Sequence, residues 1–215
     1  EAGGEGGEAG ARVIVGGDPL PSVTDAELAL AAGAPVLFPD HGSNVAVVES
    51  PDAPLDLAAV SDRVVRGRYV NQRVAVGSME THGFAANVGD DGRLVVWASN
   101  QFPHYVRNQL AAALGVTNDT IHLITPQVGG GFGGKAGIQH EYTVVAAAAR
   151  RLGRPVMWTP TRSEDMMAMA HSRGQVQYAE LGCRDDGTFT GLRVHLVGDG
   201  GAYPGIGASL PGGTR

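Results

Sequence analysis

The clearest alternation of apolar and polar positions lies near the end of the chain, in two segments on either side of a turn. Residues 175–184 and 188–197 flank the sequence DDG, and in the second segment leucine and valine alternate with Arg193 and His195. A period of two residues is typical of a half-buried strand, and an Asp-Gly pair between two strands is typical of a hairpin. The two segments are therefore predicted to form a long β-hairpin.

Between residue 63 and this hairpin, segments of strand length alternate with segments of helix length. One helix is predicted over 103–114, because Pro103 suits the first turn and Gly115 suits the stop, and a second is predicted over 137–152. Ser163 is predicted to cap a short helical turn. The predicted strands cover residues 64–76, 94–98, 120–128 and 155–159. Mixed sheets with packed helices indicate an α+β fold.

The first 62 residues have a different pattern. Residues 1–10 contain only Glu, Ala and Gly, which bury too little apolar surface to offset the entropy of ordering, so this stretch is predicted to be disordered. A short strand is predicted at 12–15 and a helix at 25–31, with Thr24 as its N-cap. A boundary near residue 62 is therefore expected.

Composition and charge exclude several classes of partner. The net charge of −6 leaves no basic surface for nucleic acid or an anionic membrane. No apolar run approaches the roughly 18 residues of a membrane span, and no secretory leader opens the chain, so we expect a cytoplasmic protein without a membrane span. A single cysteine, Cys183, cannot form an internal disulfide and does not suggest a metal cluster.

The segment QVGGGFGGK at 127–135 is the strongest candidate for chemistry. It places five glycines around Phe132, between a predicted strand and a predicted helix. Glycine permits positive φ and close approach of the backbone, and N–H groups at a helix N-terminus can bind an anion or a cofactor oxygen. We therefore expect this loop to bind a ligand.

Three interpretations of the loop follow from its residues alone. Residues 129–135 fit the phosphate-binding pattern G-x-x-x-x-G-K, but Ala136 stands where Mg²⁺ binding needs Ser or Thr. The glycines also fit G-x-G-x-x-G, although the acidic residue of that fingerprint is missing and Arg162 would favour NADP. In the third interpretation, a non-catalytic module, the glycines only let a helix pack close to a sheet.

A further interpretation comes from resemblance. Taken with WASNQFPH at 97–104, the glycine-rich segment resembles the large subunits of molybdenum hydroxylases, the xanthine dehydrogenase, aldehyde oxidase and carbon monoxide dehydrogenase family. In that family a glutamine follows a W-x-S/T strand, a helix intervenes and a glycine-Phe loop comes next, as Gln101 and Phe132 do here. Residues 162–166 and 198–203 also resemble the sequences of this family.

The resemblance implies a fold and a cofactor. Residues 1–62 would be a disordered start and the C-terminal remnant of a small α/β, hammerhead-like domain, and 63–215 the N-terminal part of the molybdopterin-binding domain. Its molybdenum–pterin cofactor, molybdopterin as the cytosine dinucleotide, would hold the metal through pterin sulfurs without protein ligands. Gln101 would hydrogen-bond a molybdenum oxygen, and Phe132 would lie beside it as the second catalytic residue. The implied cofactor-binding residues are Gln101, Gly130, Gly131, Phe132, Gly133 and Gly134.

The resemblance also implies an activity. The enzyme would transfer a water-derived oxygen to carbon monoxide, an aldehyde or a heterocycle, and pass two electrons to an iron–sulfur small subunit and a flavin-binding medium subunit. A purine is disfavoured, because purine-hydroxylating members have glutamate at the position of Ala136. The general-base glutamate and later cofactor loops of the family would follow Arg215. We therefore expect the chain to be truncated and, alone, to be inactive.

Overall fold

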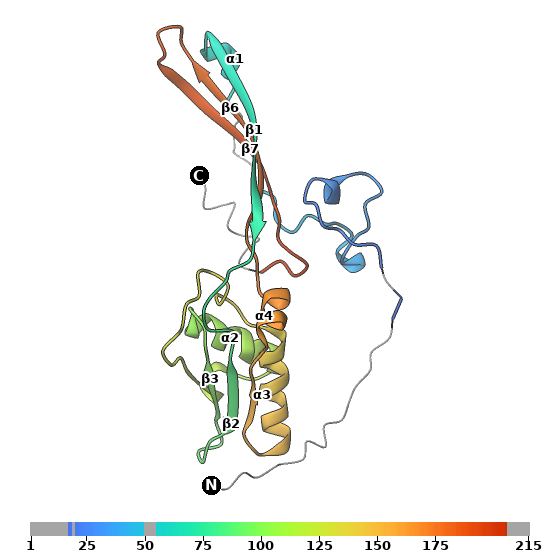
Figure 1. The fold of residues 1–215 in the computed structure, drawn as a ribbon, viewed down its shortest axis with the longest axis vertical. Helices are drawn as coiled ribbons and strands as arrows, with labels where there is room; N and C mark the ends of the chain where they lie inside the picture. The colour runs from blue at the N-terminus through green and yellow to red at the C-terminus, as the bar shows by residue number, and fades with distance from the viewer. Residues whose placement is uncertain (1–16, 19, 50–54, 206–215) are drawn as a thin grey trace.

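Two separate β-sheets organise the chain in the computed structural model, which describes residues 17–18, 20–49 and 55–205 (Figure 1). A long three-stranded sheet extends away from the part of the molecule that carries the larger helices. The smaller, four-stranded sheet lies within that helical part, and it supports the glycine-rich loop. The α+β class expected from the sequence is confirmed.

The long sheet is antiparallel, with the strand order β1-β6-β7. Strand β1 is Arg63–Val74, β6 is Ser172–Cys183 and β7 is Phe189–Gly198. The predicted C-terminal hairpin is confirmed as β6 and β7. Strand β1 was expected from its apolar residues, yet most of its residues are exposed. Of the helices, the short Leu57–Val60 contacts this sheet, whereas the longer helices lie against the other sheet.

The four-stranded sheet has the order β4-β3-β2-β5, in which only β3 and β4 are parallel neighbours. Its strands are β2 Phe84–Val88, β3 Leu94–Ala98, β4 Ile121–Ile124 and β5 Val156–Trp158. The predicted strand 120–128 is too long, since β4 ends at Ile124. The residues that follow it leave the sheet and lead into the glycine-rich loop.

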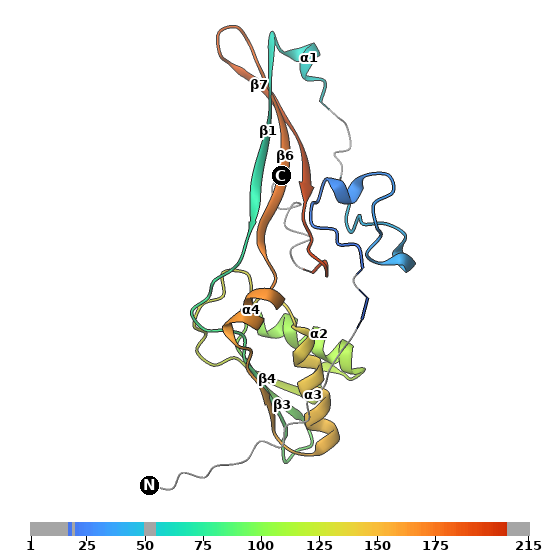
Figure 2. The same ribbon diagram turned by 45° about the vertical axis from the view of Figure 1, so that its right-hand side comes forward.

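Helices α2, Pro103–Leu114, and α3, His140–Leu152, pack against this sheet (Figure 2). Alternate residues of β2 and β3 are buried beneath them, so one sheet face forms the core. Within it the ring of Tyr142 stacks on that of Phe84 with centroids 4.5 Å apart. The bounds of α2 are as predicted, and Gly115 ends it in the left-handed region with φ 65°. Helix α3 begins three residues later than predicted.

The described residues before β1 hold only short helices, which are two 3₁₀ turns, Leu28–Leu30 and Pro39–His41, and helix α1, Leu57–Val60. The predicted helix 25–31 with a Thr24 cap is therefore wrong. Asp25 is the residue that accepts hydrogen bonds here, from the N–H groups of Glu27 and Leu28. The predicted disorder at 1–10 and strand at 12–15 lie outside the described residues, and the boundary at residue 62 stays a prediction.

Candidate functional site

The glycine-rich loop contains a tight turn with an aromatic side chain at its tip. The N–H of Gly134 donates to the carbonyl of Gly131 at 2.8 Å. The two residues between them, Phe132 and Gly133, have φ values of 48° and 91°. Two positive φ values in sequence are a feature of type I′ turns, and they are unusual for a bulky residue such as phenylalanine. Phe132 is 75% exposed, so the turn presents this residue to the outside.

Both the side chain and the main chain of Gln101 form hydrogen bonds with this loop. Its Oε1 accepts hydrogen bonds from the N–H of Gly133 at 2.9 Å and of Lys135 at 3.2 Å, while its own N–H donates to the Lys135 carbonyl at 2.9 Å. A backbone N–H can only donate, which assigns the amide oxygen to the loop. The amide Nε2 is left as a donor that no described residue occupies.

Two of the glycines are needed because side chains approach them closely. A Cβ at Gly131 would lie 2.5 Å from the Cδ and Oε1 atoms of Gln101. A Cβ at Gly129 would lie 2.5 Å from the Cβ of Glu80. Both distances are well below van der Waals contact, so a larger residue would displace Gln101 or Glu80. The glycines thus permit the contact between loop and glutamine.

Beneath the loop lies an ion pair between Glu80 and Lys135. Lys135 Nζ is 2.7 Å from Glu80 Oε2 and 2.9 Å from Ser99 Oγ. The same Glu80 oxygen accepts from Ser99 Oγ at 2.6 Å and from the Gly129 N–H at 2.8 Å. Burial opposes ionisation of this carboxyl, but the hydrogen bonds from Lys135, Ser99 and Gly129 and the lysine charge outweigh it and lower the pKa of Glu80 to about 2.

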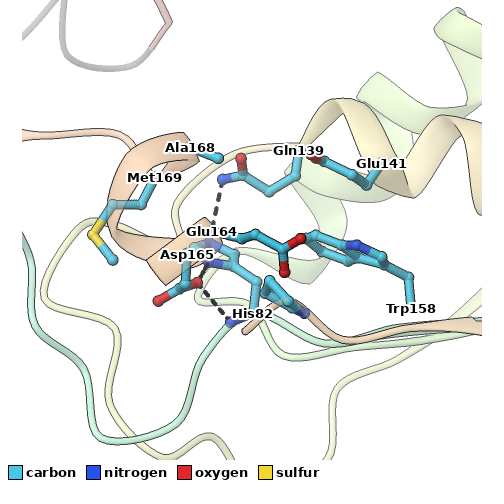
Figure 3. Close-up of a pocket in the computed structure, with 9 residues that line it drawn as sticks. His82, Gln139, Glu141, Trp158, Glu164, Asp165, Ala168 and Met169 are labelled. Carbon is cyan, nitrogen blue, oxygen red and sulfur yellow. Dashed lines mark hydrogen bonds and ion pairs between the residues drawn. The ribbon is translucent and has the colours of Figure 1, made fainter. Parts of the chain in front are cut away.

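His82 and Asp165 form a second buried pair (Figure 3). Asp165 Oδ1 is 2.6 Å from His82 Nδ1 and accepts from the His82 N–H at 3.0 Å. Burial opposes ionisation of Asp165, but these bonds and the charge of Arg162 lower its pKa. His82 Nε2 lies 3.3 Å from the Gly134 carbonyl and 3.2 Å from Gln139 Nε2.

A cavity of about 90 Å³ adjoins the pair, lined by His82, Gln139, Glu141, Trp158, Pro160, Glu164, Asp165, Ala168 and Met169.

The structure brings Gln101 and the loop around Phe132 together, but not at the start of a helix. Helix α3 begins at His140, so the loop N–H groups do not extend that helix, and two of them serve Gln101 instead. Lys135 is buried in its ion pair, which does not fit a lysine that reaches phosphates. Strands β4 and β5 are separated by β3 and β2, so the glycine fingerprint does not lie in a βαβ unit of neighbouring strands.

Three residues of this site were not predicted as such: Glu80, His82 and Asp165. Their partners are far along the chain, at a sequence separation of 55 residues for Glu80 and Lys135 and of 83 residues for His82 and Asp165. No local pattern could therefore pair them. The one usable signal was the lysine next to a glycine-rich loop, since a lysine that becomes buried requires an acidic partner.

Comparison with known proteins identifies the family. Residues 37–214 match the model of the molybdopterin cofactor-binding domain. The chain belongs to this family, the molybdopterin-binding domains of molybdenum hydroxylase large subunits. The match extends across the predicted boundary at residue 62, and so includes part of the segment before β1.

Curated relatives and solved structures of the family resemble the chain over most of its length. The nicotine 6-hydroxylase large subunit of Paenarthrobacter nicotinovorans is 37% identical over 144 residues, which cover 66% of this chain and 18% of that protein. The carbon monoxide dehydrogenase large chain of Hydrogenophaga pseudoflava is 31% identical over 202 residues, covering 86% and 25%. The structure of quinoline 2-oxidoreductase from Pseudomonas putida 86 superimposes with a TM-score of 0.77 at 34% identity, covering 86% and 24%. The chain thus spans about a quarter or less of these relatives.

Among the residues that the structure describes, no helix has both the length and the apolar character that crossing a bilayer requires. Within the same residues, no three side chains among His, Cys, Asp and Glu are grouped so that they could hold a metal ion.

Proposed function

We propose that Gln101 and the loop 129–135 form one wall of the molybdopterin site in an oxidoreductase. The observation that carries this proposal is the orientation of the Gln101 amide. Because Oε1 accepts from the Gly133 and Lys135 N–H groups, Nε2 is the donor that remains for a group beside Phe132. A donor held by two main-chain bonds requires little reorganisation when it binds an oxygen of the cofactor.

The residues fit such a group in size as well as polarity. A Cβ at Gly133 would meet no atom within 4 Å, so a flat pterin could approach the backbone of the turn at this glycine. When bound, the cofactor supplies a two-electron oxidation in which a water-derived oxygen is transferred to a substrate carbon. Gln101 would orient the cofactor by donation from Nε2, and Phe132 would limit the access of water. We propose the cytosine dinucleotide form of the cofactor.

The substrate and partners follow from the same proposal. Carbon monoxide, an aldehyde or a heterocycle suits the site better than a purine, because Ala136 is buried and offers no carboxylate. Electrons would pass to an iron–sulfur small subunit and a flavin-binding medium subunit. The names of the relatives, a large subunit and a large chain, support an assembly of this kind. We expect the 215-residue chain by itself neither to retain the cofactor nor to turn over.

Gln101→Glu in the full-length gene product tests the role of the amide. A glutamate still accepts from the Gly133 and Lys135 N–H groups but no longer donates. We expect wild-type protein to contain molybdenum and pterin, and the variant to keep its thermal stability while losing roughly 10- to 1,000-fold in kcat/KM. The measurements are metal and pterin analysis, thermal unfolding, and oxidation of carbon monoxide, an aldehyde and an N-heterocycle with a dye acceptor.

Gln109→Glu is the matched control, because Gln109 Oε1 also accepts a backbone bond, from the Ile138 N–H at 3.1 Å. This variant should keep wild-type kcat/KM. Wild-type protein without molybdenum would contradict the proposed cofactor. Equal activity of the two variants would contradict the role of Gln101.

A further inference from the structure

Both ends of the glycine-rich loop are attached to the same carboxylate. At the first end, Glu80 Oε2 accepts from the Gly129 N–H, and the Glu80 N–H donates to the Gly129 carbonyl at 3.1 Å. At the last end, the same oxygen binds Lys135 Nζ. The main chain of Lys135 in turn holds Gln101, through its N–H and its carbonyl. A continuous chain of contacts therefore joins Glu80, Lys135 and the Gln101 amide.

The two charges differ in their exposure to water. The Lys135 side chain is 1% exposed, whereas that of Glu80 is 40% exposed. A buried ammonium without an anion is unfavourable, while water can hydrate the carboxylate of Glu80 if its lysine is removed. Loss of Glu80 should therefore release both ends of the loop. Loss of Lys135 should release only the end next to Gln101.

We propose that Glu80 and Lys135 are positioning residues. The pair holds the two ends of the loop, Gly129 and Lys135, together and thereby orients the Gln101 amide and Phe132. Its importance for the cofactor rests on the function proposed above. Neither side chain needs to touch the cofactor. Ser99 completes the pair, because its hydroxyl bonds to both members and it lies two residues before Gln101 in the chain.

The test is hydrogen–deuterium exchange of single backbone amides in the full-length gene product. In Glu80→Ala, the amides of Gly129 and Gly133 should both exchange at least about tenfold faster than in wild type, because each loses a bond or the support of one. In Lys135→Met, Gly133 should exchange faster while Gly129 stays protected. The double variant contains no unpaired buried charge, so it should fold, and both amides should exchange fast.

Glu180→Ala is the matched control. Glu180 also binds two cations, Arg66 and Arg193, but it lies on β6 in the other sheet. Its removal should leave exchange at Gly129 and Gly133 unchanged. If Glu80→Ala does not fold, the contrast between Lys135→Met and the double variant still decides the proposal.

Molybdenum content and kinetics of the same preparations separate this proposal from the proposed function. If the pair positions Gln101, Lys135→Met should lower kcat about tenfold with little change in KM. Unchanged exchange of both amides in Lys135→Met and in the double variant would overturn the positioning role, whatever the metal content. Faster exchange in the expected pattern, in wild-type protein that lacks molybdenum, would support the pair and overturn only the proposed function.

Discussion

At the scale of single residues, the site depends on a phenylalanine in an unfavourable conformation and on a glycine that cannot be enlarged. Phe132 has φ 48°, which costs an L-residue roughly 1–2 kcal/mol. The bond from Gly134 to Gly131 and the bonds from Gly133 and Lys135 to Gln101 hold the turn in this state. Such strain is common where a loop is shaped for a ligand.

Gly131→Ala should move Gln101 away from the loop. The added Cβ would lie 2.5 Å from the Cδ of Gln101, and the displaced amide would lose its bonds to the backbone, so we expect a destabilisation of about 1–3 kcal/mol. Gly137→Ala is the control, since the nearest atom to its Cβ would be Gln109 Oε1 at an ordinary 3.8 Å; its effect should stay within about 0.5 kcal/mol. Urea unfolding measures both. Equal effects would mean that Gln101 is not held as described.

At the scale of elements, the short helix α4, Arg162–Ala168, lies in the chain between β5 of the four-stranded sheet and β6 of the long sheet. It carries Asp165, which holds His82, and Arg162, whose Nη2 donates to the Met79 carbonyl at 2.7 Å. The helix starts with a capping box in which Thr161 and Glu164 bind each other's N–H groups. The predicted cap at Ser163 was two residues late, although the pattern T-x-x-E was present in the sequence.

Thr161→Ala should destabilise the protein by about 1 kcal/mol, because the hydroxyl that accepts from the Glu164 N–H is lost. Fraying of this helix should also loosen Asp165, so the His82 amide should exchange with solvent faster. Ser163→Ala should change stability by less than about 0.5 kcal/mol, since the cap is at Thr161. Thermal unfolding and amide exchange are the measurements. A larger loss in Ser163→Ala than in Thr161→Ala would refute the assigned cap.

At the scale of the whole molecule, two carboxylates connect parts of the chain that are far apart in sequence. Glu80 joins the segment before β2 to the glycine-rich loop, and Asp165 joins α4 to His82. Hydrogen bonds and nearby positive charge lower the pKa of each carboxyl. Folding of the site is therefore coupled to their ionisation.

The stability of the protein should fall in acid. The pKa of Glu80 is lowered from 4.5 to about 2 in the folded state, so the unfolded chain takes up a proton first as the pH falls. The contribution of the Glu80 carboxylate to the free energy of unfolding is fully present above pH 4.5 and is lost as the pH falls toward 2. Glu80→Gln should therefore show a weaker dependence of Tm on pH in this range than wild type. Parallel Tm curves for the two proteins would exclude Glu80 as a source of acid sensitivity.

Much of the fold could be predicted because its signals are local. The proline and glycine that bound α2 lie within the helix ends themselves, and the alternation of β6 and β7 surrounds a short turn. A local signal also explains why the predicted helix at 25–31 was wrong. Its pattern favours a helix, but the segment does not pack against the described hydrophobic core, and only a 3₁₀ turn forms. The pairing of Gln101 with the Phe132 loop was expected from resemblance, and no rule of spacing would have produced it.

From residue 63 onward, the amino-acid sequence by itself determined most of the helices and strands, and it determined the family, because helix stops, turns and the motifs around Gln101 and Phe132 are contiguous in the chain. Only the tertiary structure decided which way the Gln101 amide faces, which carboxylate neutralises Lys135, and that the glycine-rich loop stands apart from the start of α3. These features depend on contacts between residues tens of positions apart. Such contacts follow from the packing of helices on the four-stranded sheet and have no signature in any single segment.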